Sequence, residues 1–117
     1  MKTRTHKLKK KRSFQKIFGS ASRPRLSIFR SNKHIYAQLI DDALGQTLAF
    51  SSSLDSHLIQ KNESGANKNA SFVVGQDIAK KAFQKNINQV IFDRGERKYH
   101  GRIESLAEGA RKEGLVF

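Results

Sequence analysis

The stretch RLSIFRSNKHIYAQLIDDALGQTLAF, residues 25–50, alternates apolar and polar side chains and is broken twice by turn residues. Its alternating apolar positions are Leu26 and Ile28, then Ile35, Ala37 and Leu39, then Leu48 and Phe50. A period of two is typical of strands that bury one face. The breaks at Ser31–Lys33 and Asp42–Gly45 are as short as hairpin turns, which join antiparallel neighbours. The stretch therefore predicts three antiparallel strands.

Apolar residues change to helical spacing in the second half of the chain. Residues 51–70 are rich in Ser, Asn and Lys and predict a mobile loop. A helix is predicted from Ser71 to Lys85, and another after Gly101, with Gly114 as its stop signal. The two apolar stripes are Val74, Ile78, Ala79, Ala82 and Phe83 in the first helix, and Ile103, Leu106, Ala107 and Ala110 in the second. Between the helices, Val90–Phe92 suits a short buried strand.

The order of elements predicts a small α/β fold, α+β-like in character. A mixed sheet of three antiparallel strands plus a fourth strand would carry both helices on one side, giving the order (α)βββαβα with a basic N-terminal arm or helix. At 117 residues the chain fits one small domain. We expect residues 1–22 to form the arm and residues 23–117 a single compact domain, with the mobile loop at about 51–70.

The composition excludes several classes of protein. There is no Cys, which excludes disulfides, Cys-based zinc sites and thiol catalysis. The absence of Cys is compatible with a protein of a reducing compartment. No apolar run reaches the length of a signal peptide core or of a membrane span. The basic N-terminus also lacks the Arg and Ser bias of an organelle transit peptide. We therefore expect a soluble protein without a membrane partner.

Positive charge is concentrated in the first third of the chain. The net charge is +13, and residues 1–33 hold twelve Lys and Arg and no acid, whereas residues 34–117 hold eleven bases and ten acids. Such a block neutralises phosphates and releases their counterions, so a polyanion is the expected partner. An anionic membrane would need a wide apolar helix face, and residues 2–13 offer only Leu8. RNA and DNA therefore remain as candidate partners. If the partner is DNA, the alternative function is that of a general DNA-compacting protein.

The arm itself is expected to fold on its partner. Like charges at helical spacing, such as Lys7 and Lys11, disfavour an isolated helix. Phe14, Ile17 and Phe18 form an apolar cluster, and Gly19 could end a helix that begins near Thr3. The alternative is a flexible, solubilising tail. The arm's candidate RNA contacts are Arg4, Lys7, Lys9, Lys10, Lys11, Arg12 and Lys16.

Two further segments mix cations with residues able to contact bases. Residues 94–102 join the last strand to the last helix and supply Arg94, Lys98, Tyr99, His100, Gly101 and Arg102. Around the first strand and turn lie Arg23, Arg25, Phe29, Arg30, Ser31, Asn32, Lys33 and His34. Cations meet phosphates and rings stack on unpaired bases. A partnerless charged loop is the alternative for the first segment. In the second, Phe29 and Tyr36 face away from the core, and Phe29 could instead be covered by the apolar cluster of the arm.

An enzyme is the alternative to a binding protein, because Asp41 and Asp93 end strands, where paired carboxylates can hold metal ions for phosphodiester cleavage. A third carboxylate in a suitable position for a metal site is missing, because Asp42 lies in a turn and Asp77 on a helix. The histidines at 6, 34, 57 and 100 do not have the spacing of metal ligands. No phosphate-binding glycine loop or nucleophile motif is present. We expect no catalytic residue, metal, cofactor or small-molecule substrate.

Residues 23–38, RPRLSIFRSNKHIYAQ, continuing to Ile40–Asp42, closely resemble the bacterial L18 family of large-subunit ribosomal proteins. The resemblance resumes at Phe92–Gly95, at Lys98–Arg102 and through the last helix to Gly114, Leu115 and Phe117. It covers essentially the whole chain and is weakest at residues 51–68. The family often has Gly and an aromatic residue where this chain has Glu96 and Arg97, so contacts there are expected to differ, and Glu96 is not a candidate site residue.

This resemblance implies a structural constituent of the large ribosomal subunit in the cytoplasm. It implies binding to 5S ribosomal RNA, attachment of that RNA to the large-subunit ribosomal RNA, and a place in the central protuberance. It also implies neighbouring ribosomal proteins, such as those of the L5 family, as partners. No catalysis is implied.

Overall fold

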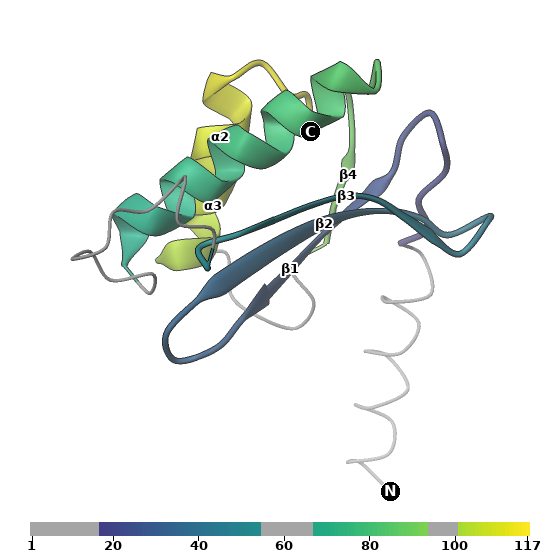
Figure 1. Cartoon of the computed structure of the whole chain (residues 1–117). Helices are drawn as coiled ribbons and strands as arrows, with labels where there is room; N and C mark the ends of the chain where they lie inside the picture. The colour runs from purple at the N-terminus through teal and green to yellow at the C-terminus, as the bar shows by residue number, and fades with distance from the viewer. Residues whose placement is uncertain (1–16, 55–66, 94–100) are drawn as a thin grey trace, which may run out of the picture.

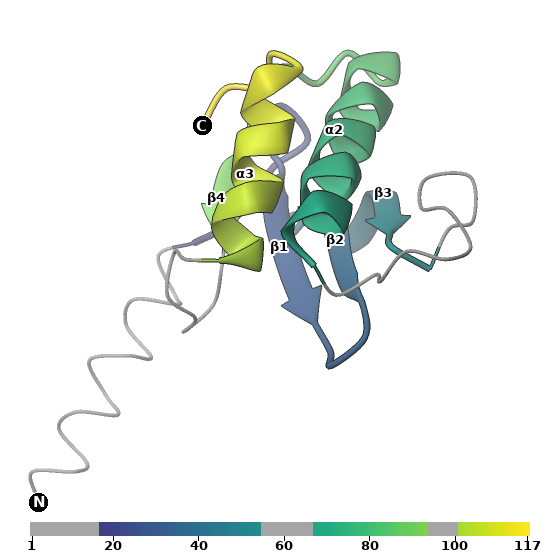
Figure 2. The same cartoon turned by 90° about the vertical axis from the view of Figure 1, so that its left-hand side faces the viewer.

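The computed structural model describes residues 17–54, 67–93 and 101–117. In these ranges the elements are β1 (Arg25–Arg30), β2 (Ile35–Asp41), β3 (Gln46–Ser52), α2 (Lys68–Gln84), β4 (Ile91–Asp93) and α3 (Arg102–Lys112). They form one sheet in the order β3-β2-β1-β4, in which β1–β2 and β2–β3 are antiparallel and β4 is parallel to β1. Both helices cover the same face of the sheet (Figures 1 and 2). The predicted α/β class is confirmed.

Alternation along β1 and β2 separates a buried face from an open one. The side chains at 26, 28, 35, 37 and 39 are buried against the helices, whereas Ser27, Phe29, Tyr36 and Gln38 point to the opposite face. Strands place successive side chains on opposite faces, so one buried face leaves the other available for binding. The expectation that Phe29 and Tyr36 lie opposite the core is confirmed.

The two helices supply the other half of the core. Asn67 precedes α2, and its side-chain oxygen accepts a hydrogen bond from the Ala70 N–H at 2.8 Å and so caps the helix. Both predicted apolar stripes face the sheet. Their buried members are Val74, Ile78, Ala79, Ala82, Ile103, Leu106, Ala107 and Ala110, and Phe83 packs partly buried beside them. None of the helices in the described ranges is long and apolar enough to cross a membrane.

α2 and α3 approach each other closely at two glycines. A Cβ on Gly75 would lie 2.0 Å from the backbone oxygen of Leu106, and a Cβ on Gly109 would lie 2.2 Å from the backbone oxygen of Phe72. Backbone atoms cannot move aside as a flexible side chain can. The contact between the helices therefore requires glycine at both positions.

Several boundaries differ from the sequence prediction. The loop expected at 51–70 is shorter at both ends, because β3 continues to Ser52 and α2 already begins at Lys68. Ser51, in that extension of β3, donates a hydrogen bond to Asp77 of α2 at 2.7 Å. Residues 55–66 lie outside the described ranges. β4 is displaced by one residue from the predicted Val90–Phe92.

Phe50 lies on the open face of the sheet, although simple alternation predicted that it would share a face with Leu48. The pairing between β2 and β3 shifts after Leu39, so that Leu39 pairs with Ala49 and Ile40 pairs with Thr47. This irregularity leaves Leu48 without a partner and reverses the alternation, as a β-bulge does. As a result, the Phe50 ring joins the face of Tyr36.

Candidate nucleic-acid interface

The turn between β1 and β2 is held by hydrogen bonds at its base. The Ser31 N–H donates to the His34 carbonyl at 2.8 Å, and the His34 N–H donates to Ser31 Oγ at 3.2 Å. His34 Nδ1 also shares a hydrogen bond with Ser53 Oγ at 3.1 Å. These contacts fix the turn while Asn32 and Lys33 remain exposed at its tip. The hairpin therefore presents a cation and an amide on a firm support.

The start of α3 meets this turn. Arg102 Nη1 donates a hydrogen bond to the Ser31 carbonyl at 3.1 Å, across 71 residues of sequence. Partial burial lowers the pKa of the Arg102 guanidinium, and the positive charge of the nearby Arg30 lowers it further. Arginine nevertheless stays protonated in proteins. Within the described ranges neither arginine forms an ion pair. Two guanidinium groups from distant segments therefore lie together, which favours an anionic partner.

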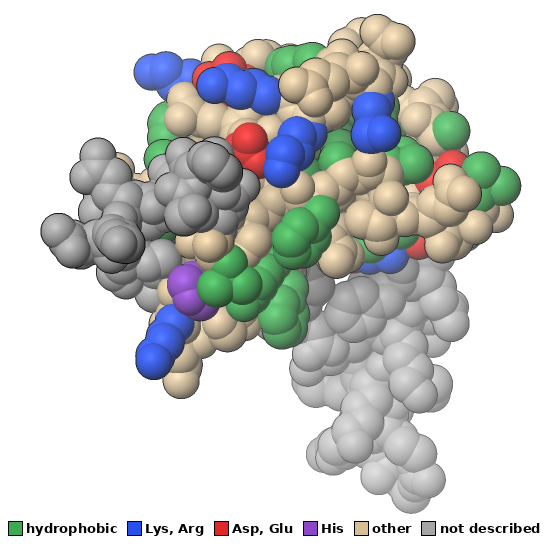
Figure 3. Space-filling view, viewed as in Figure 1, with side chains coloured by type: hydrophobic (Ala, Val, Ile, Leu, Met, Phe, Trp, Pro, Cys, Tyr) green, Lys and Arg blue, Asp and Glu red, His purple; other side chains and the backbone are tan. Residues whose placement is uncertain are grey.

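Three aromatic rings form a row across the open face, which we call the aromatic row: Phe29 of β1, Tyr36 of β2 and Phe50 of β3. The centroids of Phe29 and Tyr36 are 5.4 Å apart, and those of Tyr36 and Phe50 are 6.4 Å apart. Phe29 is 58% exposed and Phe50 is 46% exposed. In Figure 3, hydrophobic side chains gather on the face away from the helices, bordered by a His and by a Lys or Arg side chain. The row offers ring faces to a partner.

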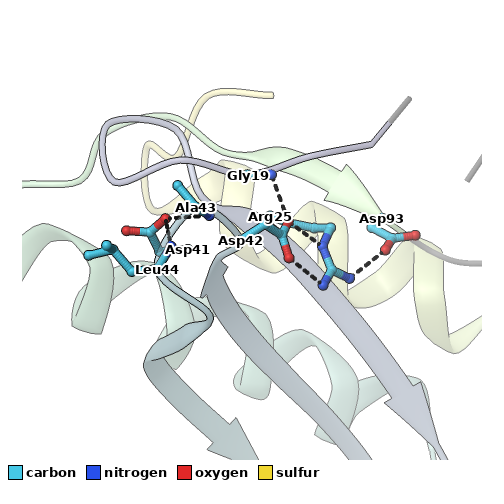
Figure 4. Close-up of polar contacts among 7 residues, drawn as sticks. All are labelled: Gly19, Arg25, Asp41, Asp42, Ala43, Leu44 and Asp93. Carbon is cyan, nitrogen blue, oxygen red and sulfur yellow. Dashed lines mark hydrogen bonds and ion pairs between the residues drawn. The ribbon is translucent and has the colours of Figure 1, made fainter. Parts of the chain in front are cut away.

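Arg25, a predicted RNA contact, lies in a network of carboxylates (Figure 4). Its Nε and Nη2 donate to Asp42 at 2.9 and 3.0 Å, and its Nη1 donates to Asp93 at 2.8 Å. The two hydrogen bonds to Asp42 and, less strongly, the hydrogen bond to Asp93 raise the pKa of Arg25, although partial burial opposes the rise. We therefore treat Arg25 as a residue that positions neighbouring segments, and an RNA contact at Arg25 stays a prediction.

The same network also binds Gly19, in the described part of the arm. The Gly19 N–H donates to Asp42 Oδ2 at 2.7 Å, and the Asp42 N–H donates to the Gly19 carbonyl at 3.0 Å. A Cβ on Gly19 would lie 2.3 Å from the backbone nitrogen of Arg25, so only glycine allows this approach. The predicted arm helix falls mostly outside the described residues, and residues 17–19, which are described at its expected end, are not helical.

The predicted contacts in the arm and in the loop before α3 lie outside the described residues. They are Arg4, Lys7, Lys9, Lys10, Lys11, Arg12, Lys16, Arg94, Lys98, Tyr99 and His100. Gly101, the residue before α3, has a φ of 58°, which suits glycine. Arg23 is exposed before β1. The structure thus brings Arg102 together with Ser31, which lies between Arg30 at the end of β1 and Lys33 in the turn, and it places Phe29 on the open face of the sheet.

The carboxylates at the ends of the strands have partners within the fold. Asp41 is buried and accepts hydrogen bonds from the N–H groups of Ala43 and Leu44, at 3.0 and 3.3 Å, so it orders the turn after β2. Asp93 binds Arg25. In residues 17–54, 67–93 and 101–117, no three His, Cys, Asp or Glu side chains gather as a metal site would need.

Two residues important to this surface were not predicted from the sequence. The alternation along β3 predicts Phe50 on the face of Leu48, and only the shift in pairing with β2 moves Phe50 into the aromatic row. The sequence predicts Asp42 as a turn residue only, whereas in the structure it links Arg25 to Gly19. The sequence does contain a pattern that could have predicted the pairing of Asp42 with Arg25. An acid directly after a strand can meet a base that begins the neighbouring antiparallel strand.

Comparison with known proteins relates the whole chain to a family. The family model described as ribosomal L18 of archaea, bacteria, mitochondria and chloroplast matches residues 1–117. The chain is 57% identical to the large ribosomal subunit protein uL18 of Synechococcus elongatus over 101 residues, which are 86% of this chain and 84% of the relative. It is 53% identical to uL18 of Thermotoga petrophila over 103 residues, 88% of this chain and 84% of that protein. With uL18c of Guillardia theta the identity is 56% over 102 residues, 87% and 95% of the two chains.

Proposed function

The chain belongs to the ribosomal L18 family, and from this premise we propose that it binds 5S ribosomal RNA and helps attach it to the large-subunit ribosomal RNA in the central protuberance. The family consists of structural ribosomal proteins, so the protein is a component of the large ribosomal subunit and not an enzyme. Its partners are therefore ribosomal RNA and other ribosomal proteins. We include proteins of the L5 family among those neighbours.

The contact between Arg102 and Ser31 is the observation that carries the proposal. It joins two segments that were each predicted to bind RNA and that lie 71 residues apart in sequence. Arg30 lies close enough to lower the pKa of Arg102, and Lys33 is exposed at the tip of the same turn. A group of cations on firm secondary structure can fix the position of a folded RNA through its phosphates. A disordered tail alone would bind any polyanion.

The proposal divides RNA binding between two parts of the chain. The acid-free arm supplies affinity through counterion release, which depends little on which RNA is bound. Selectivity comes from the surface formed by the turn at 31–34 and the start of α3, together with the predicted contacts of residues 94–100. Shape and unpaired bases, rather than the deep groove of an RNA helix, are what such a surface can read.

The test is a competition for the full chain at physiological salt. Labelled 5S RNA is bound first, and either unlabelled 5S RNA, an unrelated folded RNA of equal length or duplex DNA is then added. Displacement by 5S RNA at a much lower concentration than by the other two is the expected result. Equal displacement by duplex DNA would contradict the proposal and favour a general DNA-compacting protein.

A pair of variants on one helix locates the surface. Arg102→Ala removes a cation at the first residue of α3, and Lys112→Ala removes one at the last. We expect Arg102→Ala to weaken 5S RNA binding and to reduce the dependence of affinity on salt, and Lys112→Ala to change neither. Equal effects of the two would mean that general charge, rather than this surface, decides binding.

A further inference from the structure

We propose that Lys81 of α2 guards the edge of β3 and prevents the free chain from pairing with a second copy of itself through that edge. The proposal goes beyond the proposed function, because it concerns the chain outside the ribosome and involves no RNA. The edge strand of a sheet carries backbone N–H and C=O groups that no neighbouring strand takes, so it is a template for pairing with another chain. Folded proteins protect such edges with charged side chains, short strands or covering segments.

The two edges of this sheet differ in length and in cover. β4 has three residues, and the C-terminal segment pairs with the residues just before it. The Val90 N–H donates to the Val116 carbonyl at 3.1 Å, and the Val116 N–H donates to the Asn88 carbonyl at 3.0 Å. The opposite edge is β3, with seven residues, and Figure 2 shows α2 on the β3 side of the sheet and α3 on the β4 side. The longer edge, β3, therefore has the greater need of protection.

β3 carries no charge of its own. The sequence has neither a charged residue nor a Pro from Ala43 to Leu54, a stretch that contains the whole strand. Within it, the Phe50 side chain is 46% exposed. Strand-forming segments without charge or Pro are the ones that pair most readily between chains. A protecting charge must therefore come from another part of the fold.

Phe50 and Ser52 present their backbone groups on the outer side of β3. The Ser53 N–H donates to the Ile35 carbonyl at the start of β2, at 3.0 Å, and the pairing of the two strands is regular in this part. Residues of an antiparallel strand alternate between those that bond to the neighbouring strand and those that do not. Ser51 therefore also points its backbone groups toward β2, whereas Phe50 and Ser52 point theirs away from it.

The Lys81 ammonium lies on this outer side. Its Nζ donates a hydrogen bond to the Phe50 carbonyl at 2.7 Å, across 31 residues of sequence. The same Nζ lies 3.0 Å from Asp77 Oδ2, which also accepts a hydrogen bond from Ser51 Oγ at 2.7 Å. Lys81 is thus held by the strand that it covers and by its own helix. A second strand can pair there only if it displaces the ammonium or buries its charge, and both are unfavourable.

The first experiment measures self-association of the free, full-length chain by analytical ultracentrifugation. Lys81→Met removes the ammonium and keeps an apolar side chain of similar length. We expect this variant to associate about 10- to 150-fold more tightly than the parent chain, the equivalent of one hydrogen bond to a charged group. Lys81→Arg keeps the charge and the donors and should behave as the parent chain does. Lys80→Met is the matched control, because Lys80 is the adjacent, exposed residue of α2.

A double variant and amide exchange identify the surface that associates. Thr47 is exposed on β3, so Thr47→Lys places a charge on the strand itself. Combined with Lys81→Met, it should restore the weak association of the parent chain. In Lys81→Met alone, association should slow hydrogen exchange at the outward N–H groups of Phe50 and Ser52. Association of Lys81→Met without this protection, or no increase in its association, would overturn the proposal.

The unmodified chain provides a second test, which decides the proposal if Lys81→Met does not fold. The N–H groups of Phe50 and Ser52 should exchange equally fast at low and at high protein concentration, because a guarded edge does not pair. Exchange that slows at both groups as the concentration rises would overturn the guard. The proposed function is tested separately, because neither measurement contains RNA.

Discussion

Arg25 holds the carboxylate of Asp42 with two hydrogen bonds, from Nε at 2.9 Å and from Nη2 at 3.0 Å. Asp42 in turn binds the backbone of Gly19, which lies near the end of the predicted arm. The third bond of Arg25 reaches Asp93, the residue directly before the segment 94–100. One guanidinium thus connects the base of the arm with the base of the loop, the two segments that carry most of the predicted RNA contacts.

Removal of the Asp42 carboxylate should destabilise the domain. The side chains of Arg25 and Asp42 are 22% and 19% exposed, so this ion pair is neither fully exposed to solvent nor fully buried. Asp42→Ala leaves Nε and Nη2 of Arg25 and the Gly19 N–H without their acceptor, whereas Nη1 of Arg25 keeps its bond to Asp93. We expect the free energy of unfolding to fall by about 1–3 kcal/mol, measured by urea denaturation. Glu108→Ala, at an exposed position of α3, is the control and should change it little.

The same carboxylate makes stability depend on pH. The hydrogen bonds from Arg25 and, secondly, from the Gly19 N–H lower the pKa of Asp42 below its usual 3.8 in the folded protein. The unfolded chain therefore binds a proton first as pH falls. The stabilisation is complete above pH 3.8 and disappears as the pH falls through the lowered pKa. Unfolding measured from about pH 5 to about pH 2 should show a smaller loss of stability in Asp42→Asn than in the parent chain. Equal losses in both would contradict this assignment.

Local pattern predicted the elements, and the residues it missed depend on contacts between distant segments. The apolar alternation of β1 and β2 and the stripe of α3 are local, so the strands, the helix and their buried sides could be predicted. The face of Phe50 depends on where β3 pairs with β2, which no residue of β3 reveals alone. The sequence predicts Arg25 as an RNA contact and does not reveal its carboxylate partners, because they lie 17 and 68 residues away. The arginine pair of residues 30 and 102 likewise exists only after folding.

Alanine at either helix-contact glycine should separate α2 from α3. Gly75→Ala and Gly109→Ala would place a methyl group 2.0 to 2.2 Å from backbone oxygens of the other helix. Alanine gains up to about 1 kcal/mol of helix propensity, yet overpacking of this kind costs about 1–3 kcal/mol or more. We expect a net loss of stability in thermal unfolding. Ala substitution of the exposed Lys80, between these contacts and the end of α2, is the control. A more stable Gly75→Ala variant would show that the helices can move apart at little cost.

Truncation of the arm should weaken RNA binding and make it less sensitive to salt. Deleting residues 1–16 removes eight bases and leaves the contacts of Gly19 with Asp42 intact. Each lost phosphate contact should reduce the slope of log K against log salt by up to about 0.9. Binding isotherms of the truncated and full chains between about 50 and 200 mM salt provide the measurement. A matched chain with the eight bases replaced by Gln separates charge from length. An unchanged slope in both variants would show that the arm does not contact phosphates.

The last prediction concerns the pair of arginines at the turn. If Arg30 and Arg102 bind the same part of the RNA, Arg30→Ala and Arg102→Ala should each weaken 5S RNA binding, and the double variant should show a loss different from their sum. Residues that share a partner couple in this way, whereas distant residues add within about 0.5 kcal/mol. Paired measurements of affinity for the four chains complete the cycle. Arg30→Ala combined with Lys112→Ala serves as the uncoupled reference, because Lys112 ends α3 on the far side. Additivity within error for Arg30 and Arg102 would mean that the two contact separate sites.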